Sequence, residues 1–213
     1  MEAIETETYR GITIAFYQDD MPDNPRAWDN LGTMACGHRR YELGDEQLRG
    51  REDLEAIENN PDNLWLPLYL YDHSGIAMRT GPFYGWQHWQ WDSGRIGVIY
   101  VSREKVLKEF DAKRLTKRLR KRVLAILEGE VAVYNQYLQG DVYGYVLTGP
   151  GGEEIDSCWG FFGGDDVKDE ARKVARLYAG KQARAAALQK MQAYLDRLPC
   201  VVAAAERLQA GAA

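Results

Sequence analysis

The chain has 213 residues, of which 45% are hydrophobic and 11% aromatic, so it can build a core and is not a disordered protein. Its 27 Lys and Arg residues against 32 Asp and Glu give a net charge of −5, which offers no global attraction for nucleic acid. That charge is also too dilute to imitate duplex DNA, which carries one phosphate charge per ~1.7 Å.

The cysteines and the N-terminal segment favour a cytoplasmic protein. Cys36, Cys158 and Cys200 lie far apart and form no CxxC pair, a pattern that fits a reducing compartment better than a disulfide scaffold. The N-terminal sequence MEAIETETYRG is acidic and lacks the apolar segment of a secretory signal. No stretch approaches the ~18 apolar residues of a membrane span, so we expect no membrane contact.

The first half of the chain is rich in predicted strands. Residues 9–18 alternate between apolar and polar positions, and residues 19–30 contain two prolines and several Asx residues typical of a loop. Residues 46–59 are predicted to form a short surface helix. Residues 64–71 alternate more sharply, with leucines on one face and Trp65, Tyr69 and Tyr71 on the other. Two further strands are predicted at 76–80 and 95–101.

The second half is dominated by helices. Ser102 is a predicted N-cap for a long central helix, which Gly140 ends. Residues 142–148 and 155–161 are predicted to pair as a hairpin across the glycine-rich turn at 149–152. A final long helix begins at Asp165 or Asp166, and Pro199 ends it. Its apolar positions are Val174, Leu177, Leu188, Met191, Leu195 and Leu198.

Strands joined by hairpins, with helices segregated between them, indicate the α+β class. We expect an antiparallel sheet of about five to seven strands, a long central helix and a long C-terminal helix. The predicted organisation is an α+β domain at 1–163 and a C-terminal helical extension at 164–213. That extension would pack on the domain or pair with a second copy as a homodimer.

One segment, Pro82 to Asp92, reads PFYGWQHWQWD and holds three of the six tryptophans. The rings can pack over the aromatic strand face as a small second core, as most tryptophans do. Alternatively, one or two rings stay exposed to bind a partner protein, a sugar ring or a base. Both can hold for different rings. The predicted partner-binding residues are Trp86, His88, Trp89, Trp91 and Asp92.

A basic run at 113–122 has seven positive residues in ten. On a helix, four of them form a basic contact stripe opposite Leu115, Leu119 and Val123: Arg114, Lys117, Arg118 and Lys121. A solvated helix face is the default interpretation, and electrostatic contact with nucleic acid or an acidic protein is the alternative. Because the whole chain is acidic, we expect nucleic-acid binding to be weak.

Residues that could carry chemistry are scattered. Asp29, Asp72, His73 and Asp92 could surround a hard cation or a water nucleophile, although Asp before Asn or Ser is also ordinary turn chemistry. Cys36-Gly37-His38 supplies two soft ligands, whereas structural zinc needs four. The phosphate-binding, hydrolase and metalloprotease motifs are missing. We therefore predict no catalytic residue, no metal and no cofactor, and a protein that is not an enzyme.

Four longer stretches resemble a functionally uncharacterised family of proteins encoded by bacteriophages and other mobile elements. They are WDNLGTMACGHRRYELGD (28–45), WDSGRIGVIYVS (91–102), EGEVAVYNQYLQGDVYGYVL (128–147) and EEIDSCWGFFG (153–163). The resemblance covers most of residues 9–163 and carries over no residue roles. It implies a phage accessory setting, in which small proteins often act by binding a host machine.

Three functional hypotheses follow. The leading one is a non-catalytic accessory protein that binds a host protein complex in the host cytoplasm, as an inhibitor of a bacterial defence system of the anti-CRISPR or antirestriction type. The alternative is a nucleic-acid-associated protein that uses the basic stripe and the aromatic segment. The third is a small metal-dependent hydrolase built on Asp29, His73 and Asp92.

Overall fold

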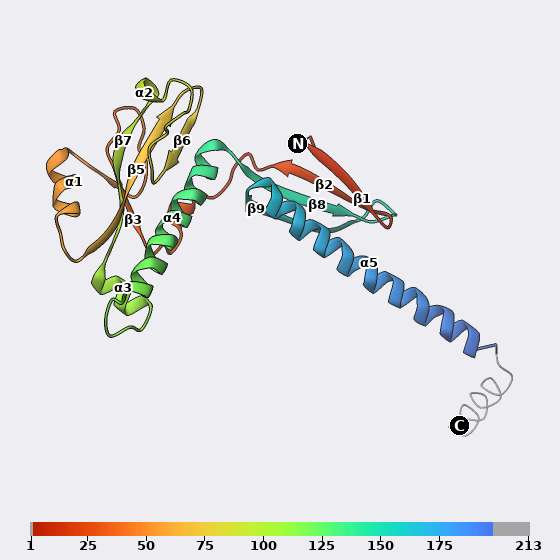
Figure 1. The fold of residues 1–213 in the computed structure, drawn as a ribbon. Helices are drawn as coiled ribbons and strands as arrows, with labels where there is room; N and C mark the ends of the chain where they lie inside the picture. The colour runs from red at the N-terminus through yellow and green to blue at the C-terminus, as the bar shows by residue number, and fades with distance from the viewer. Residues whose placement is uncertain (1, 198–213) are drawn as a thin grey trace. The chain divides into compact units, whose positions relative to one another are not determined.

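The computed structural model describes residues 2–197 of the chain. These residues contain nine strands, five α-helices and one 3-10 turn, joined by loops (Figure 1). The α+β class, the long central helix and the long C-terminal helix are confirmed. The strands form two sheets, of four and five strands, rather than one.

Two compact units account for the described residues, and they do not follow the predicted boundary at residue 163. Unit 1 combines residues 2–17, 144–159 and 165–197, and unit 2 combines residues 18–143 and 160–164. The helix after residue 163 therefore belongs with strands from both ends of the predicted domain. Residues 198–213, including Leu198, Pro199 and Cys200, lie outside the described part of the chain.

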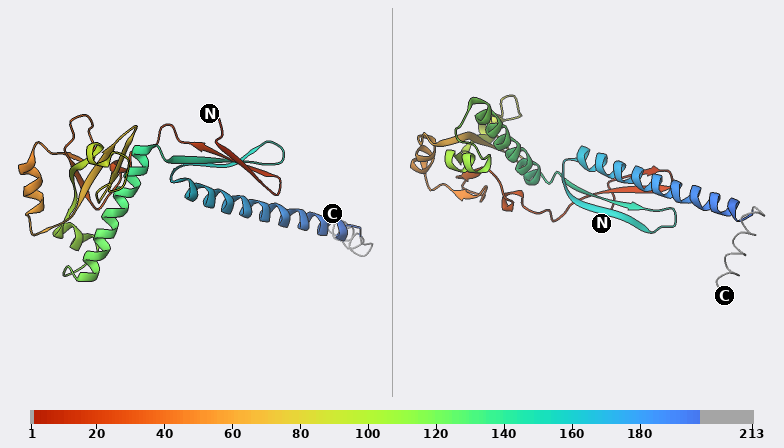
Figure 2. Two further views of the ribbon diagram at one scale, coloured as in Figure 1. Left: turned by 45° about the horizontal axis from the view of Figure 1, so that its top comes forward. Right: turned by 90° about the horizontal axis from the view of Figure 1, so that it is seen from below.

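Unit 1 is built on the four-stranded sheet, in the order β1-β2-β8-β9, with helix α5 along it (Figure 2). Its elements are β1 (Glu5–Tyr9), β2 (Ile12–Gln18), β8 (Val142–Thr148), β9 (Glu154–Phe162) and α5 (Gly164–Leu195). The predicted strand at 9–18 and the predicted hairpin strands are confirmed. β1 adds a strand that the sequence did not predict, antiparallel to β2.

Helix α5 approaches its sheet through small side chains. Its buried residues are Val167, Ala171, Ala175 and Ala179, four residues apart. Arg172 also forms an ion pair with Glu7 of β1, and hydrogen bonding to Arg172 lowers the pKa of Glu7. The first half of the helix therefore packs on its own sheet. Four of the apolar positions named from the sequence are exposed: Leu177, Leu188, Met191 and Leu195.

Unit 2 is built on the five-stranded sheet, in the order β4-β3-β7-β5-β6. The strands are β3 (Thr33–Cys36), β4 (Glu46–Gln47), β5 (Asn63–Asp72), β6 (Ile76–Arg79) and β7 (Ser93–Ser102). The pairs β3–β7, β5–β7 and β5–β6 are antiparallel, and the short β3–β4 pair is parallel. The other elements are η1 (Pro25–Ala27), α1 (Arg51–Glu58), α2 (Trp89–Asp92), α3 (Arg103–Glu109) and α4 (Lys117–Gln139).

The core of unit 2 lies between the sheet and helix α4. The predicted leucine face of β5 contributes Leu64, Leu68 and Leu70, which are at most 2% exposed. They share one cluster with the buried stripe of α4: Val123, Leu127, Val131 and Tyr134. The strand period of two and the helix spacing of three to four were therefore correct predictors of this interface.

Two predicted helices differ from expectation, although Ser102 caps α3 as predicted. The surface helix begins at Arg51, because Glu46 and Gln47 pair with β3. The central helix is interrupted: α3 ends at Glu109, and Asp111 adopts a left-handed φ of 44°. Thr116 then caps α4 by accepting a hydrogen bond from the Leu119 N–H.

A network of charged groups ties three segments of unit 2 together. The Arg26 guanidinium, only 4% exposed, bonds to Asp45 through Nη2 at 2.6 Å and to Glu130 of α4 through Nη1 at 3.0 Å. Glu130 also accepts the backbone N–H groups of Leu31 and Gly32, at 2.9 and 3.1 Å. Burial disfavours the Arg26 charge, but these acidic partners outweigh it and raise its pKa.

The reactivity of the Cys36 thiol tests the packing of the hydrophobic core of unit 2, to which Cys36 belongs. Cys36 is fully buried, and burial raises its pKa to about 12. In a variant with Cys158→Ser and Cys200→Ser, we expect Cys36 to react with a thiol reagent near pH 8 at least about 100-fold more slowly in buffer than in urea, because only the thiolate attacks. Equal labelling rates in the two conditions would contradict the buried position.

Candidate functional site

The aromatic segment at 82–92 lies partly on the sheet of unit 2 and partly in solvent. Phe83 is 1% exposed and packs against Tyr71, with ring centroids 5.5 Å apart. These two residues and Ala77 form a small second core, with Tyr69 and Trp89 packed against it. The prediction that some rings cover the aromatic face of β5 is confirmed for Tyr69 and Tyr71. Trp65 instead donates to the Glu58 carbonyl.

Three rings of the segment remain accessible, and we call them the aromatic surface: Tyr84, Trp86 and Trp91. Their exposed fractions are 70%, 43% and 84%. Trp86 stands edge-on to the rings of Phe83 and Tyr71, at centroid distances of 5.0 and 5.1 Å. Two of the three tryptophan rings, those of Trp86 and Trp91, are therefore exposed as predicted, and Tyr84 adds a third exposed ring.

Local hydrogen bonds hold the backbone that carries these rings. His88, with a left-handed φ of 53°, precedes the single turn of α2. The Tyr71 hydroxyl donates to the Gln87 carbonyl at 2.8 Å, and the Ser93 hydroxyl donates to the Trp89 carbonyl at 2.6 Å. The segment is therefore fixed to β5 and β7 although it has little regular structure.

The five predicted partner-binding residues lie close together but differ in exposure. Trp86, His88 and Trp91 are exposed, and Trp89 is half-buried with its ring edge-on to Tyr84 at 4.8 Å. Asp92 is also half-buried, and its carboxylate is paired with His73 Nδ1 at 2.8 Å. Their role in binding stays a prediction.

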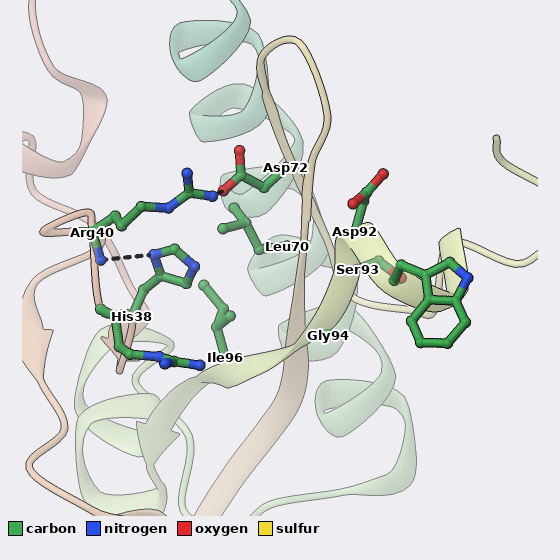
Figure 3. Close-up of a pocket in the computed structure, with 10 residues that line it drawn as sticks. His38, Arg40, Leu70, Asp72, Asp92, Ser93, Gly94 and Ile96 are labelled. Carbon is green, nitrogen blue, oxygen red and sulfur yellow. Dashed lines mark hydrogen bonds and ion pairs between the residues drawn. The ribbon is translucent and has the colours of Figure 1, made fainter. Parts of the chain in front are cut away.

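A cleft of about 530 Å³ lies beside the aromatic surface (Figure 3). Its polar lining includes His38 and Arg40 from the loop after β3 and Asp72 from the end of β5. Figure 3 shows Arg40 and Asp72 reaching toward each other, and they form an ion pair. Trp91 and Asp92 also line this cleft, so the aromatic surface continues into a polar depression.

The four residues that the sequence offered for a cation or a water nucleophile lie together only in part: Asp29, Asp72, His73 and Asp92. Asp72 and Asp92 line the cleft, and His73 is bonded to Asp92. Asp29 lines a different cleft, with Lys105 and Glu109. Within residues 2–197, no three His, Cys, Asp or Glu side chains are arranged to hold a metal ion. Cys36 lies in the core, whereas His38 is half-buried and stacks on Tyr41 with ring centroids 5.0 Å apart.

The basic contact stripe is only partly helical. Lys117, Arg118 and Lys121 lie in the first turns of α4, but Arg114 lies in the loop before the Thr116 cap and is not on the helix. The correction follows from the break between α3 and α4, because the left-handed Asp111 interrupts the helix that the apolar spacing predicted.

Sequence reasoning missed Tyr84 as a site residue, and it missed the Arg40–Asp72 pair. The sequence signal for Tyr84 is the glycine that follows it, because glycine is typical of turns, where side chains are often exposed. In the structure Gly85 has a positive φ of 83°. The Arg40–Asp72 pair joins residues 32 positions apart, and no local pattern indicates it.

No protein-family model, no curated protein and no solved structure matches the chain. Among the described residues, no helix combines the length and the apolar character that crossing a membrane requires.

Proposed function

We propose that this chain is a non-catalytic binding protein of a bacteriophage or mobile element, and that its aromatic surface contacts a protein complex in the host cytoplasm. The proposed target is a bacterial defence complex of the kind that anti-CRISPR or antirestriction proteins inhibit. The observation that carries the proposal is the exposure of Tyr84, Trp86 and Trp91 from one short, anchored segment.

The exposed parts of these rings contribute no burial energy to the isolated chain. An aromatic side chain has roughly 150–250 Å² to bury, at about 25 cal/mol per Å². Leaving Trp91 84% exposed therefore forgoes roughly 3–5 kcal/mol of stabilisation. Tryptophan and tyrosine are the residues that most often dominate protein interfaces, where a partner supplies this burial.

The surface is also prepared for binding. Trp86 rests edge-on to two packed rings, and the backbone around Trp91 is held by hydrogen bonds from Tyr71 and Ser93. A partner that buries these rings has little loop entropy to remove, which favours affinity. The polar cleft at one side supplies charged groups for orientation.

The test is capture of a partner from lysate of the bacterial host by the immobilised full chain. Replacing both Trp86 and Trp91 with alanine should lower the affinity for the captured complex by about 30-fold or more, since truncating even one hot-spot residue costs ~2 kcal/mol or more. Trp28→Ala is the matched control, because Trp28 is 50% exposed and lies outside the aromatic surface. An equal effect of the two changes would contradict the proposal, as would the absence of any retained complex.

A further inference from the structure

Helix α4 borders a second candidate surface of unit 2, lined by none of the residues of the aromatic segment. It is a groove of about 480 Å³ that combines apolar and charged side chains. The lining residues are Leu66, Lys117, Arg120, Lys121, Leu124, Ala125 and Glu128. Nothing in the proposed function uses this groove.

The apolar part of the groove is open because the first half of β5 lies at the edge of the sheet. β6 pairs only with Tyr69–Asp72, whereas β7 pairs with β5 from Asn63 to Tyr71. Among the described strands, the first half of β5 therefore has a neighbour on one side only. Leu66 in this half is only half-buried, as is Leu124 on α4. The groove thus offers hydrocarbon surface that the fold leaves partly uncovered.

The charged part of the groove is electrostatically unbalanced. Lys117, Arg120 and Lys121 form no ion pair and no side-chain hydrogen bond with the described residues. They occupy the first turns of α4, where the helix dipole is positive and acidic residues are favoured. These three cations repel one another and the positive end of the helix dipole. A negatively charged group bound in the groove would relieve this repulsion and so stabilise the first turns of α4.

We propose that this groove binds an acidic segment of a partner protein, whose apolar side chains contact Leu66 and Leu124 while its carboxylates pair with Lys117, Arg120 and Lys121. The charge complementarity and the hydrocarbon lining point to the same occupant. A nucleic-acid backbone fits less well, because its phosphates and sugars would leave the hydrocarbon of Leu66 and Leu124 without an apolar partner.

The experiment measures binding of the full chain to a short fluorescein-labelled peptide of alternating acidic residues and leucine, by fluorescence anisotropy. Two further probes are the same peptide with Asn and Gln in place of its acids, and an oligothymidylate of equal charge. We expect the acidic peptide to bind at least about tenfold more tightly than either of the others. Tighter binding of the oligothymidylate, or equal binding of the neutral peptide, overturns the proposal.

Two charge-reversed variants locate the binding surface. Lys117→Glu with Lys121→Glu changes two groove residues and should weaken peptide binding about tenfold or more. Arg114→Glu with Arg118→Glu makes the same change of net charge in the same basic run outside the groove, and it should weaken binding less than about threefold. Equal losses would show a general electrostatic attraction and overturn the groove as the site.

The outcome is independent of the proposed function. Lys117→Glu places a negative charge in the first turn of α4, where it favours the helix, so the groove variant is expected to stay folded. Tryptophan fluorescence checks the fold of each variant. The Trp86→Ala and Trp91→Ala variant should bind the acidic peptide as the unchanged chain does, and a loss there would assign peptide binding to the aromatic surface and overturn the groove.

Discussion

Replacing Glu130 with alanine will lower the free energy of unfolding of unit 2 by about 3–5 kcal/mol, as expected when one partner of a buried ion pair is removed. The Glu130 side chain is 11% exposed and accepts bonds from Arg26 and from the backbone of Leu31 and Gly32. Its loss leaves those two N–H groups and part of the Arg26 charge without their acceptor. The expected cost is large because Arg26 is itself only 4% exposed.

Urea unfolding followed by tryptophan fluorescence measures this effect. Five of the six tryptophans belong to unit 2, so a Trp159→Phe background makes the signal specific to it. Glu128→Ala is the matched control on the same helix, since Glu128 is exposed and bonds only weakly to Thr80 at 3.4 Å. The control should change stability by no more than about 0.5 kcal/mol. Similar values for the two variants would contradict the structural role of the network.

Phe83→Ala is the second change with a large expected effect, because Phe83 supports the aromatic surface from below. It is 1% exposed, contacts Tyr71 and Trp86, and lies beneath the Arg79 guanidinium at 5.4 Å. Truncating a buried Phe costs about 3–5 kcal/mol through lost burial and the cavity that remains. We expect that loss of stability, together with a weaker near-ultraviolet circular dichroism signal from the tryptophans.

Tyr84→Ala provides the comparison for Phe83→Ala. Tyr84 is the next residue and is 70% exposed, so its truncation should leave the free energy of unfolding within about 0.5 kcal/mol. It should still weaken partner binding if the aromatic surface is the contact. Loss of stability in Tyr84→Ala as great as in Phe83→Ala would mean that the exposed and buried rings have been assigned the wrong way round.

Local periodicity predicted the individual elements well. The alternation along β5 placed its leucines toward the core, and the spacing along α4 identified the stripe that covers them. The division into two units could not be predicted in this way, because it depends on β2 lying beside β8, more than a hundred residues later. On the C-terminal helix, apolar spacing did not identify the face that meets the sheet: that face consists of Val167 and three alanines, while Leu177 and Leu188 are exposed.

The site was predictable where one segment carries it. The density of aromatic residues at 82–92 indicated both a small core and an exposed surface, and the structure contains both. Which ring is exposed depends on the turn at His88 and on hydrogen bonds from Tyr71 and Ser93. The Arg26 network joins residues from separate segments, so composition and spacing did not indicate it, and of the polar cleft they indicated only Asp72 and Asp92.

Site-specific photocrosslinking tests the central claim most directly, namely that Trp91 meets the partner. The full chain carrying p-benzoylphenylalanine in place of Trp91 is expressed in cells of the bacterial host, irradiated and analysed by mass spectrometry. A second chain carries the same photoreactive residue in place of Trp28, which is also exposed but lies outside the aromatic surface. We expect covalent attachment of one host complex at position 91 and little or none at position 28. Attachment of the same proteins at both positions, or at neither, would contradict the aromatic surface as the binding site.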